Sequence, residues 1–161
     1  MLDVLRPLKI QLELNNRLFL SVISDIPQGL WVKRPGDSAN HAAFLALHLI
    51  DARCFMLRIL GIQTIHGFED VGKEATCLED IPEYPASEEM AKSWKRVSAD
   101  LLSSVDGVGP ELLNEAAPHE FPVNDSSKLG ALAFLAQHEA YHIGQLGIVR
   151  RILGLSPMSY S

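Results

Sequence analysis

The chain has 161 residues, of which 47% are hydrophobic and 21% charged, and its formal net charge is −6. This length and composition suit a globular protein, and we expect residues 1–161 to form a single domain. The acidic balance argues against nucleic acid as a partner, because nucleic-acid-binding domains usually carry a basic patch. No run of 18 uninterrupted apolar residues occurs, so we expect no association with a membrane.

The cysteine content and the first residues bear on the cellular compartment. Cys54 and Cys77 are the two cysteines, and no C-x-x-C pair occurs, so a disulfide scaffold is not indicated. Residues 1–7 lack a basic stretch followed by an apolar run and a cleavage site. We therefore expect a cytoplasmic protein.

The first predicted helix runs from Leu2 to Asp25, and Pro27 and Gly29 follow its end. Asn15 and Asn16 interrupt its apolar stripe, and both are candidates for a polar contact at a functional site.

The second predicted helix starts near Asp37 or Ser38, either of which can cap it, and ends before Gly61. Its apolar residues share an arc of about 140°, which predicts a buried helix. His41 and His48 lie on the same arc.

A long connection over residues 62–86 leads to the third predicted helix, from Ser87 to Val105. This helix has no capping box, because Met90 stands three residues after Ser87. A second long connection, residues 106–125, precedes a helix from Asp125 to Gly154. The pattern predicts an all-α four-helix bundle with long connections between helices two and three and between helices three and four.

The last helix has one face of small residues that includes Gly144 and Gly147. Glycine within a helix costs about 1 kcal/mol relative to alanine, which suggests a close neighbour on this face. That neighbour is either another helix of the bundle or a second subunit.

The most informative motif is His138-Glu139-Ala140-Tyr141-His142. Histidines four residues apart on a helix lie about 40° apart around the axis and about 6 Å apart along it. Both imidazoles can therefore bind one metal ion. The H-E-x-x-H pattern also occurs in zinc peptidases, where the glutamate is the general base. A zincin-type peptidase is a minor alternative here, because residues 143–161 contain no His, Asp, Glu or Cys to complete the site.

We expect His48 to supply the third ligand, since it shares the core arc of the second helix. Three imidazoles leave open positions on a metal, as in catalytic sites. His41 lies about 10.5 Å further along the axis and is expected in the core or lining the cavity. His66 and His119 fall in the connections, where we expect them to face solvent, although His119 could reach the mouth of the cavity.

Five further residues are candidates around the site. Asp51 stands one turn after His48 and could orient a ligand imidazole or act as a base, or it could be a surface residue. Glu139 could be the base for a metal-activated water or a surface carboxylate. Gln145, Tyr141 and Asn16 are candidates for contacts with the ligands or the substrate.

These motifs together resemble the DinB-like superfamily, which includes the DinB and YfiT-type proteins. His138 to Gln145 is similar to the family pattern H-x-x-x-H-x-G-Q in the last helix. Trp31 to His48 is similar to the segment in which a Trp, a Pro-Gly and a Ser precede the helix with a single ligand histidine. Residues 13–17 give a weaker third match.

The resemblance implies a four-helix bundle that holds a divalent metal, zinc or nickel, on His48, His138 and His142, and it implies frequent homodimers. Some members of the family are bacillithiol- or mycothiol-dependent S-transferases. Our leading hypothesis is therefore a metal-dependent S-transferase that uses a low-molecular-weight thiol as cosubstrate and acts on a small molecule, or a related hydrolase. The alternative is a non-catalytic metal-binding protein with a stress-response or interaction role.

Overall fold

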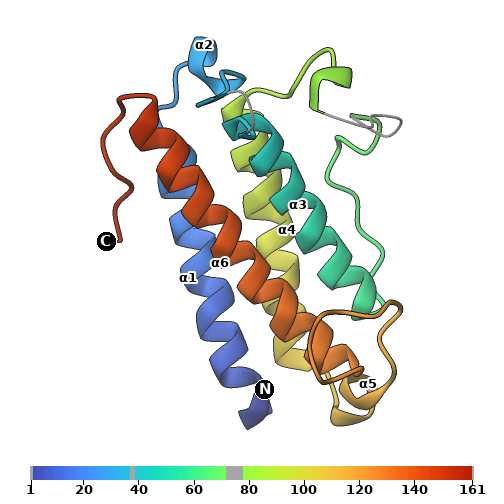
Figure 1. Cartoon of the computed structure of the whole chain (residues 1–161). Coiled ribbons are helices and arrows are strands. Elements are labelled where there is room, and N and C mark those ends of the chain that lie inside the picture. Colours follow the sequence, from blue (N-terminus) through green and yellow to red (C-terminus); the bar gives the residue numbers. More distant parts are fainter. Residues whose placement is uncertain (1, 37–38, 72–77, 161) are drawn as a thin grey trace.

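Four long helices make up most of the computed structural model, which describes residues 2–36, 39–71 and 78–160 (Figure 1). The described residues contain helices but no strand, so the all-α prediction is confirmed. The long helices are α1 (Arg6–Ile23), α3 (Ala42–Ile59), α4 (Ser87–Gly107) and α6 (Lys128–Ile152). The short ones are η1 (Asp3–Leu5), α2 (Gln28–Trp31), η2 (Leu78–Asp80) and α5 (Pro110–Asn114).

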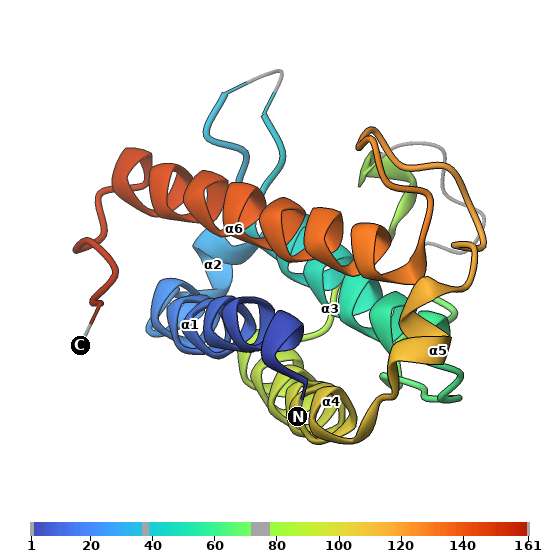
Figure 2. The ribbon, with the colours of Figure 1, turned by 90° about the horizontal axis from the view of Figure 1, so that it is seen from below.

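The long helices stand side by side, and each packs against two others. α1 and α3 both contact α4 and α6, and Figure 2 shows the four helices at the corners of the bundle. α1 and α6 run in one direction and α3 and α4 in the other (Figure 1). The connection after α3 must therefore return along the length of the bundle before α4 begins, which explains why it is long. None of the described helices is long and apolar enough to cross a membrane.

The second long helix starts later than predicted. The expected caps, Asp37 and Ser38, lie outside the described residues, and α3 begins at Ala42. The cap is His41, whose Nδ1 accepts a hydrogen bond from the backbone N of Phe44 at 3.1 Å. The predicted end is close to the observed one, and Gly61 follows it with φ +81°.

The start of α4 corrects a second expectation. The cap is Ala86, one residue before the Ser87 that we assumed, so Glu89 occupies the position of a capping-box acid. Its carboxylate accepts a hydrogen bond from the backbone N of Ala86 at 3.0 Å. The predicted absence of such an acid was therefore wrong. α6 is capped by Ser127, whose Oγ accepts from the backbone N of Gly130 at 3.2 Å.

The core consists of two apolar clusters, one at each end of the bundle. Leu12, Leu57 and Leu101 belong to one cluster, and Phe19 and Leu49 belong to the other. Between the clusters lie buried polar residues, one on each long helix: Asn15, Arg53, Ser98 and Glu139. The centre of the bundle is thus a polar layer between two apolar layers.

The small-residue face of α6 does not pack against another long helix at its two glycines. A side chain at Gly147 would meet Met158 of the C-terminal segment at 3.7 Å, while Gly144 has no neighbour within 4 Å. The C-terminal segment is held against α1, where the backbone N of Ser159 donates to Ser21 Oγ at 2.8 Å.

Candidate metal centre

Three histidine side chains from two antiparallel helices converge on one point. His48 comes from α3, and His138 and His142 come from successive turns of α6. The Nε2 atom of His138 lies 3.2 Å from Nε2 of His48 and 3.0 Å from Nε2 of His142. Each residue offers one ligand nitrogen, and the three lie within 4.8 Å of one another. The structure therefore brings together the three residues that the sequence singled out.

The spacing of these nitrogens suits a shared metal ion. Two nitrogens at about 2.0–2.1 Å from one zinc ion lie about 2.9 Å apart at a right angle and about 3.4 Å apart at a tetrahedral angle. The two separations from Nε2 of His138, 3.0 and 3.2 Å, fall in that range, and all three ligand nitrogens lie within 4.8 Å of one another. Imidazole nitrogens are also good ligands for zinc and nickel. The geometry and the donor set thus fit a divalent metal.

Each of the three imidazoles is flanked by an aromatic ring on its own helix. The ring centroids are 6.3 Å apart for Phe44 and His48, 6.0 Å for Phe134 and His138, and 5.1 Å for Tyr141 and His142. Burial, together with the smaller effects of the neighbouring His142 and His48, lowers the pKa of His138 to about 4. Burial and His142 also lower the pKa of His48, against an opposing effect of Asp51. Both rings are therefore neutral at pH 7, as metal ligands must be.

The orientation of His142 is fixed by Gln145. The Oε1 atom of Gln145 accepts a hydrogen bond from Nδ1 of His142 at 2.6 Å, and its Nε2 donates to the Tyr141 hydroxyl at 3.1 Å. A proton held on Nδ1 leaves Nε2 free to bind a metal. The Nδ1 of His138 is buried without a partner among the described residues, so this ring is positioned by packing against Phe134.

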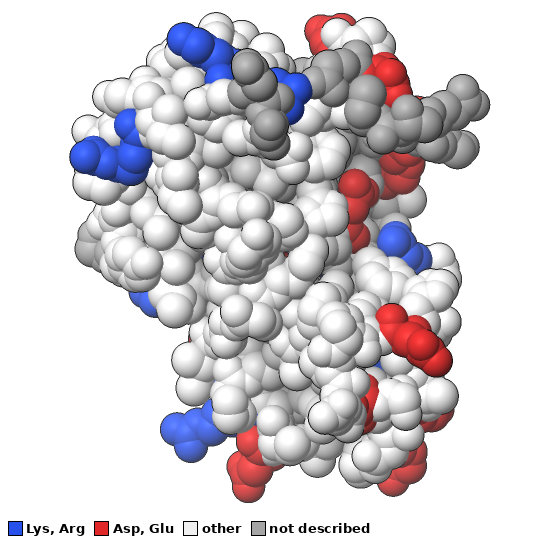
Figure 3. Space-filling view, viewed as in Figure 1, with Lys and Arg blue, Asp and Glu red and all other residues white. Residues whose placement is uncertain are grey.

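The site lies at the outer junction of α3 and α6, and all three histidines are half-buried. The sequence suggested that they would point into the core, but the core side of these helices carries Arg53 and Glu139. Charged residues are sparse on the face that α6 presents, and most of them lie at its margins (Figure 3). The surface on the α6 side of the molecule is therefore largely uncharged.

Glu139 is neither a surface carboxylate nor placed as a base for the histidine site. It is fully buried, and its Oε1 accepts from Nε of Arg53 at 2.7 Å. Its Oε2 accepts from Nη2 of Arg53 at 3.1 Å and from Nδ2 of Asn15 at 3.2 Å. Arg53 also donates to Ser98 and to the Leu12 carbonyl, and its guanidinium lies 3.8 Å from the Trp94 ring centre. The physical reason is helix geometry, since residue 139 points about 100° away from residue 138.

Asp51 contacts His66 and not a ligand histidine. Its Oδ1 accepts from Nε2 of His66 at 2.7 Å, while Nδ1 of His66 accepts from the backbone N of Phe68 at 3.1 Å. His66 is only 6% exposed, so the expectation that it faces solvent was wrong. The pair holds the start of the long connection against α3, and it does not orient a metal ligand as the sequence suggested.

The other candidates lie away from the three histidines. His41 is buried at the start of α3, with its ring 4.7 Å from that of Tyr84. His119 is exposed and lies 5.8 Å from the Phe55 ring. Asn16 is half-buried on α1, and its backbone carbonyl accepts from Nε1 of Trp94 at 3.3 Å. Asn15 belongs to the buried polar layer.

Two features of the sequence point to parts of the structure that were not predicted from it. One is Arg53, a charged residue at helical spacing from the buried Leu49 and Leu57, which indicates a buried partner. The other is the repeated pattern A-F-L-A-x-H, which occurs at residues 43–48 and again at 133–138. Because side chains four residues apart on a helix are neighbours, this repeat places one phenylalanine beside each of two ligand histidines.

Comparison with known proteins agrees with the fold and with the motifs. The model of the DinB superfamily matches residues 11–146, which include all three histidines. The crystal structure of a DinB-like protein, YjoA, from Bacillus subtilis superposes with a TM-score of 0.67 over 96% of each chain, at 12% sequence identity. No curated protein matches the sequence. The extent of the family match shows that this chain belongs to the DinB superfamily.

Proposed function

We propose that this chain is a divalent-metal-dependent enzyme that transfers a low-molecular-weight thiol to an electrophile. The observation that carries the proposal is the convergence of three imidazoles at a half-buried position, where Nε2 of His138 lies 3.2 and 3.0 Å from those of His48 and His142. Three protein ligands leave room for a further ligand, which is the arrangement of catalytic metal sites. We propose His48, His138 and His142 as the ligands of zinc or nickel.

The surrounding residues favour a thiol over water as the activated group. A divalent metal lowers the pKa of a thiol or a water that binds to it. An ordinary thiol starts from a pKa of about 8.5, whereas water starts from about 15.7, so water depends more on a neighbouring base. Neither carboxylate expected as a base is free to act on a bound water, because Glu139 is paired with Arg53 and Asp51 with His66. This weakens the hydrolase variant, and it removes the support for a zincin-type peptidase.

The protein's own thiol at Cys54 does not serve as the nucleophile. Cys54 is fully buried, and burial raises its pKa to about 11. The thiolate is the reactive form of cysteine, and it is scarce at neutral pH when the pKa is this high. Cys77 lies outside the described residues. Because no cysteine among the described residues is suited to react, we propose that the reacting thiol is a separate cosubstrate.

The first test is metal content by elemental analysis of untagged protein, compared with His48→Ala. His119→Ala is the matched control, because His119 is an exposed histidine outside the cluster. We expect about one ion per chain in the wild type and the control, and a sharp loss in His48→Ala. Retention of the metal without His48 would contradict the proposed ligand set.

The second test is turnover of metal-loaded protein with bacillithiol, mycothiol or glutathione and a model electrophile. Metal binding without turnover, together with a large fall in melting temperature when the metal is removed, would favour the non-catalytic alternative. In that case the ion would stabilise the protein by joining α3 to α6, since the ligands come from both helices. The homodimer and the cytoplasmic location stay predictions.

A further inference from the structure

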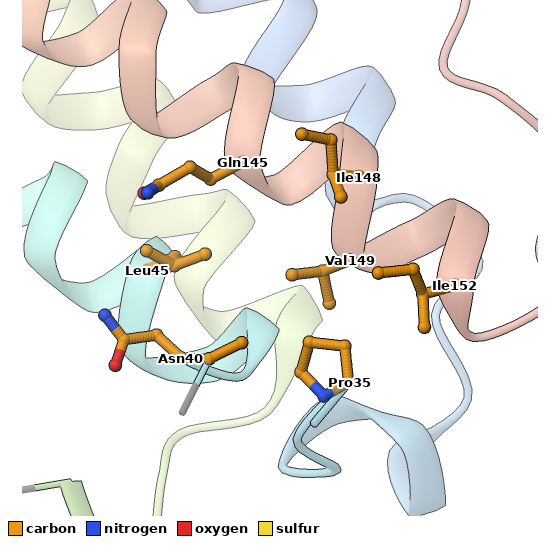
Figure 4. A pocket seen from close by; sticks show the side chains of 8 residues that line it. Pro35, Asn40, Leu45, Gln145, Ile148, Val149 and Ile152 are labelled. Carbon is orange, nitrogen blue, oxygen red and sulfur yellow. The ribbon is translucent and has the colours of Figure 1, made fainter. Parts of the chain in front are cut away.

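A pocket of about 340 Å³ lies between the C-terminal half of α6 and the residues around the start of α3 (Figure 4), and one of its lining residues, Gln145, contacts His142. One wall consists of Gln145, Ile148, Val149 and Ile152, which share one face of α6. Pro35, Asn40 and Leu45 lie on the other side. The volume lies at the lower end of the range for small-molecule sites.

The pocket has a polar end and an apolar end. Figure 4 shows the amide groups of Gln145 and Asn40 at one end, and Ile152 and Pro35 toward the other. None of the described residues that line it is charged. An anionic group would find no cation here to offset the loss of its hydration, so the lining favours an uncharged and mainly apolar molecule.

Gln145 links the polar end to the candidate metal centre. Gln145 lines the pocket and also accepts the hydrogen bond from Nδ1 of His142 at 2.6 Å. The Asn40 amide is half-buried and has no hydrogen-bond partner among the described residues, so it can bond to a ligand. At the apolar end, Ile148 and Ile152 are 62% and 59% exposed, and a ligand would cover them.

We propose that this pocket binds the electrophilic substrate, an uncharged molecule whose apolar part lies against Ile148 and Ile152 and whose polar reactive group lies at the Gln145 end. The role of the bound molecule as the electrophile rests on the proposed function, whereas the pocket itself is identified from the residues that line it. Glutathione and bacillithiol carry carboxylates at neutral pH. The uncharged lining therefore suits an uncharged electrophile better than either of these thiols.

The pocket is tested first without metal. Metal-free protein is titrated with 1-butanol, 1-hexanol and 1-octanol, and binding is followed by the backbone NMR shifts of Leu45, Ile148 and Ile152. We expect affinity to rise up to about fourfold for each added methylene, as expected for apolar burial. The increase should be lost in Ile148→Glu and Ile152→Glu. It should persist in Ile10→Glu, a control at an isoleucine on α1 that is 57% exposed.

The link between the pocket and the candidate metal centre is tested with hydroxamic acids, which bind metals through their polar group. Calorimetry compares acetohydroxamic and hexanohydroxamic acid on metal-loaded wild type, Ile148→Glu and Ile10→Glu. We expect the longer acid to bind at least tenfold more tightly to the wild type and to Ile10→Glu, and this preference to vanish in Ile148→Glu.

The outcomes separate the two proposals. If the alcohols bind without dependence on chain length, or if Ile148→Glu leaves that dependence intact, the pocket assignment is wrong, and the exposed isoleucines belong to a contact with another protein surface. Equal affinity for the two hydroxamic acids would also overturn it, because the pocket would not continue to the metal. If the protein binds neither metal nor acetohydroxamic acid, the proposed function is wrong. The titration with alcohols then tests the pocket assignment by itself.

Discussion

Arg53 and Glu139 form a fully buried ion pair in the middle of the bundle, with Nε of Arg53 2.7 Å from Oε1 of Glu139. The pair is extended by Asn15 of α1 and Ser98 of α4, so one polar layer joins all four long helices. The glutamate of the H-E-x-x-H motif therefore has a structural partner on α3, while the two histidines beside it face the candidate metal centre.

Glu139→Gln should destabilise the protein by about 3–5 kcal/mol, because it leaves the buried charge of Arg53 without a counter-charge. Urea unfolding at pH 7 measures the difference. The control is Asp106→Asn, which breaks the surface pair of Lys9 and Asp106 and should cost at most about 1 kcal/mol. A loss below 1 kcal/mol for Glu139→Gln would show that the buried pair contributes little.

The metal-free protein should lose stability as the pH falls from about 6.5 to about 4. The folded-state pKa of His138 is about 4, below its ordinary value of 6.5, so the unfolded chain binds more protons in this window. The free energy of unfolding therefore rises with pH here. His138→Gln should flatten the dependence and His119→Gln should not, as measured by urea unfolding at several pH values. Parallel curves for wild type and His138→Gln would contradict the low pKa.

Gln145→Leu should weaken metal binding by about 10- to 100-fold, because His142 loses the acceptor that holds its proton on Nδ1. Competition with a chromogenic chelator measures the affinity. Gln137→Leu is the matched control, since Gln137 is an exposed glutamine two turns earlier on the same helix. Equal affinities in the two variants would mean that Gln145 does not position the ligand.

Asp51→Ala should loosen the start of the connection after α3 and leave the metal content unchanged. Asp51 accepts a hydrogen bond from Nε2 of His66, and Nδ1 of His66 accepts a hydrogen bond from the backbone N of Phe68. Amide hydrogen exchange at Phe68 should therefore become faster in Asp51→Ala but not in Asp100→Ala, a control at an exposed aspartate of α4. Loss of metal in Asp51→Ala alone would return this residue to the metal centre.

Much of the fold follows from local sequence patterns. Apolar residues at helical spacing indicated all four long helices. The ends near Gly61 and Gly154 could be predicted because glycine readily adopts the positive φ that often follows a helix, and both glycines have a positive φ in the structure. The predicted first residues of the helices were less accurate. The cap of α3 is a histidine, and the cap of α4 is an alanine whose backbone N donates a hydrogen bond to Glu89. Neither residue type is a common helix cap.

The shared face of His138 and His142 could be predicted from the sequence, because a spacing of four residues fixes their relative direction on any α-helix. The sequence also indicated His48, an imidazole on an otherwise apolar arc. The side of α6 that faces the core could not be predicted in this way, because it depends on packing against helices far away in the chain. Arg53, 86 residues before Glu139, occupies the core side. This distant contact places the three histidines at the outer α3–α6 junction and removes Glu139 from their chemistry.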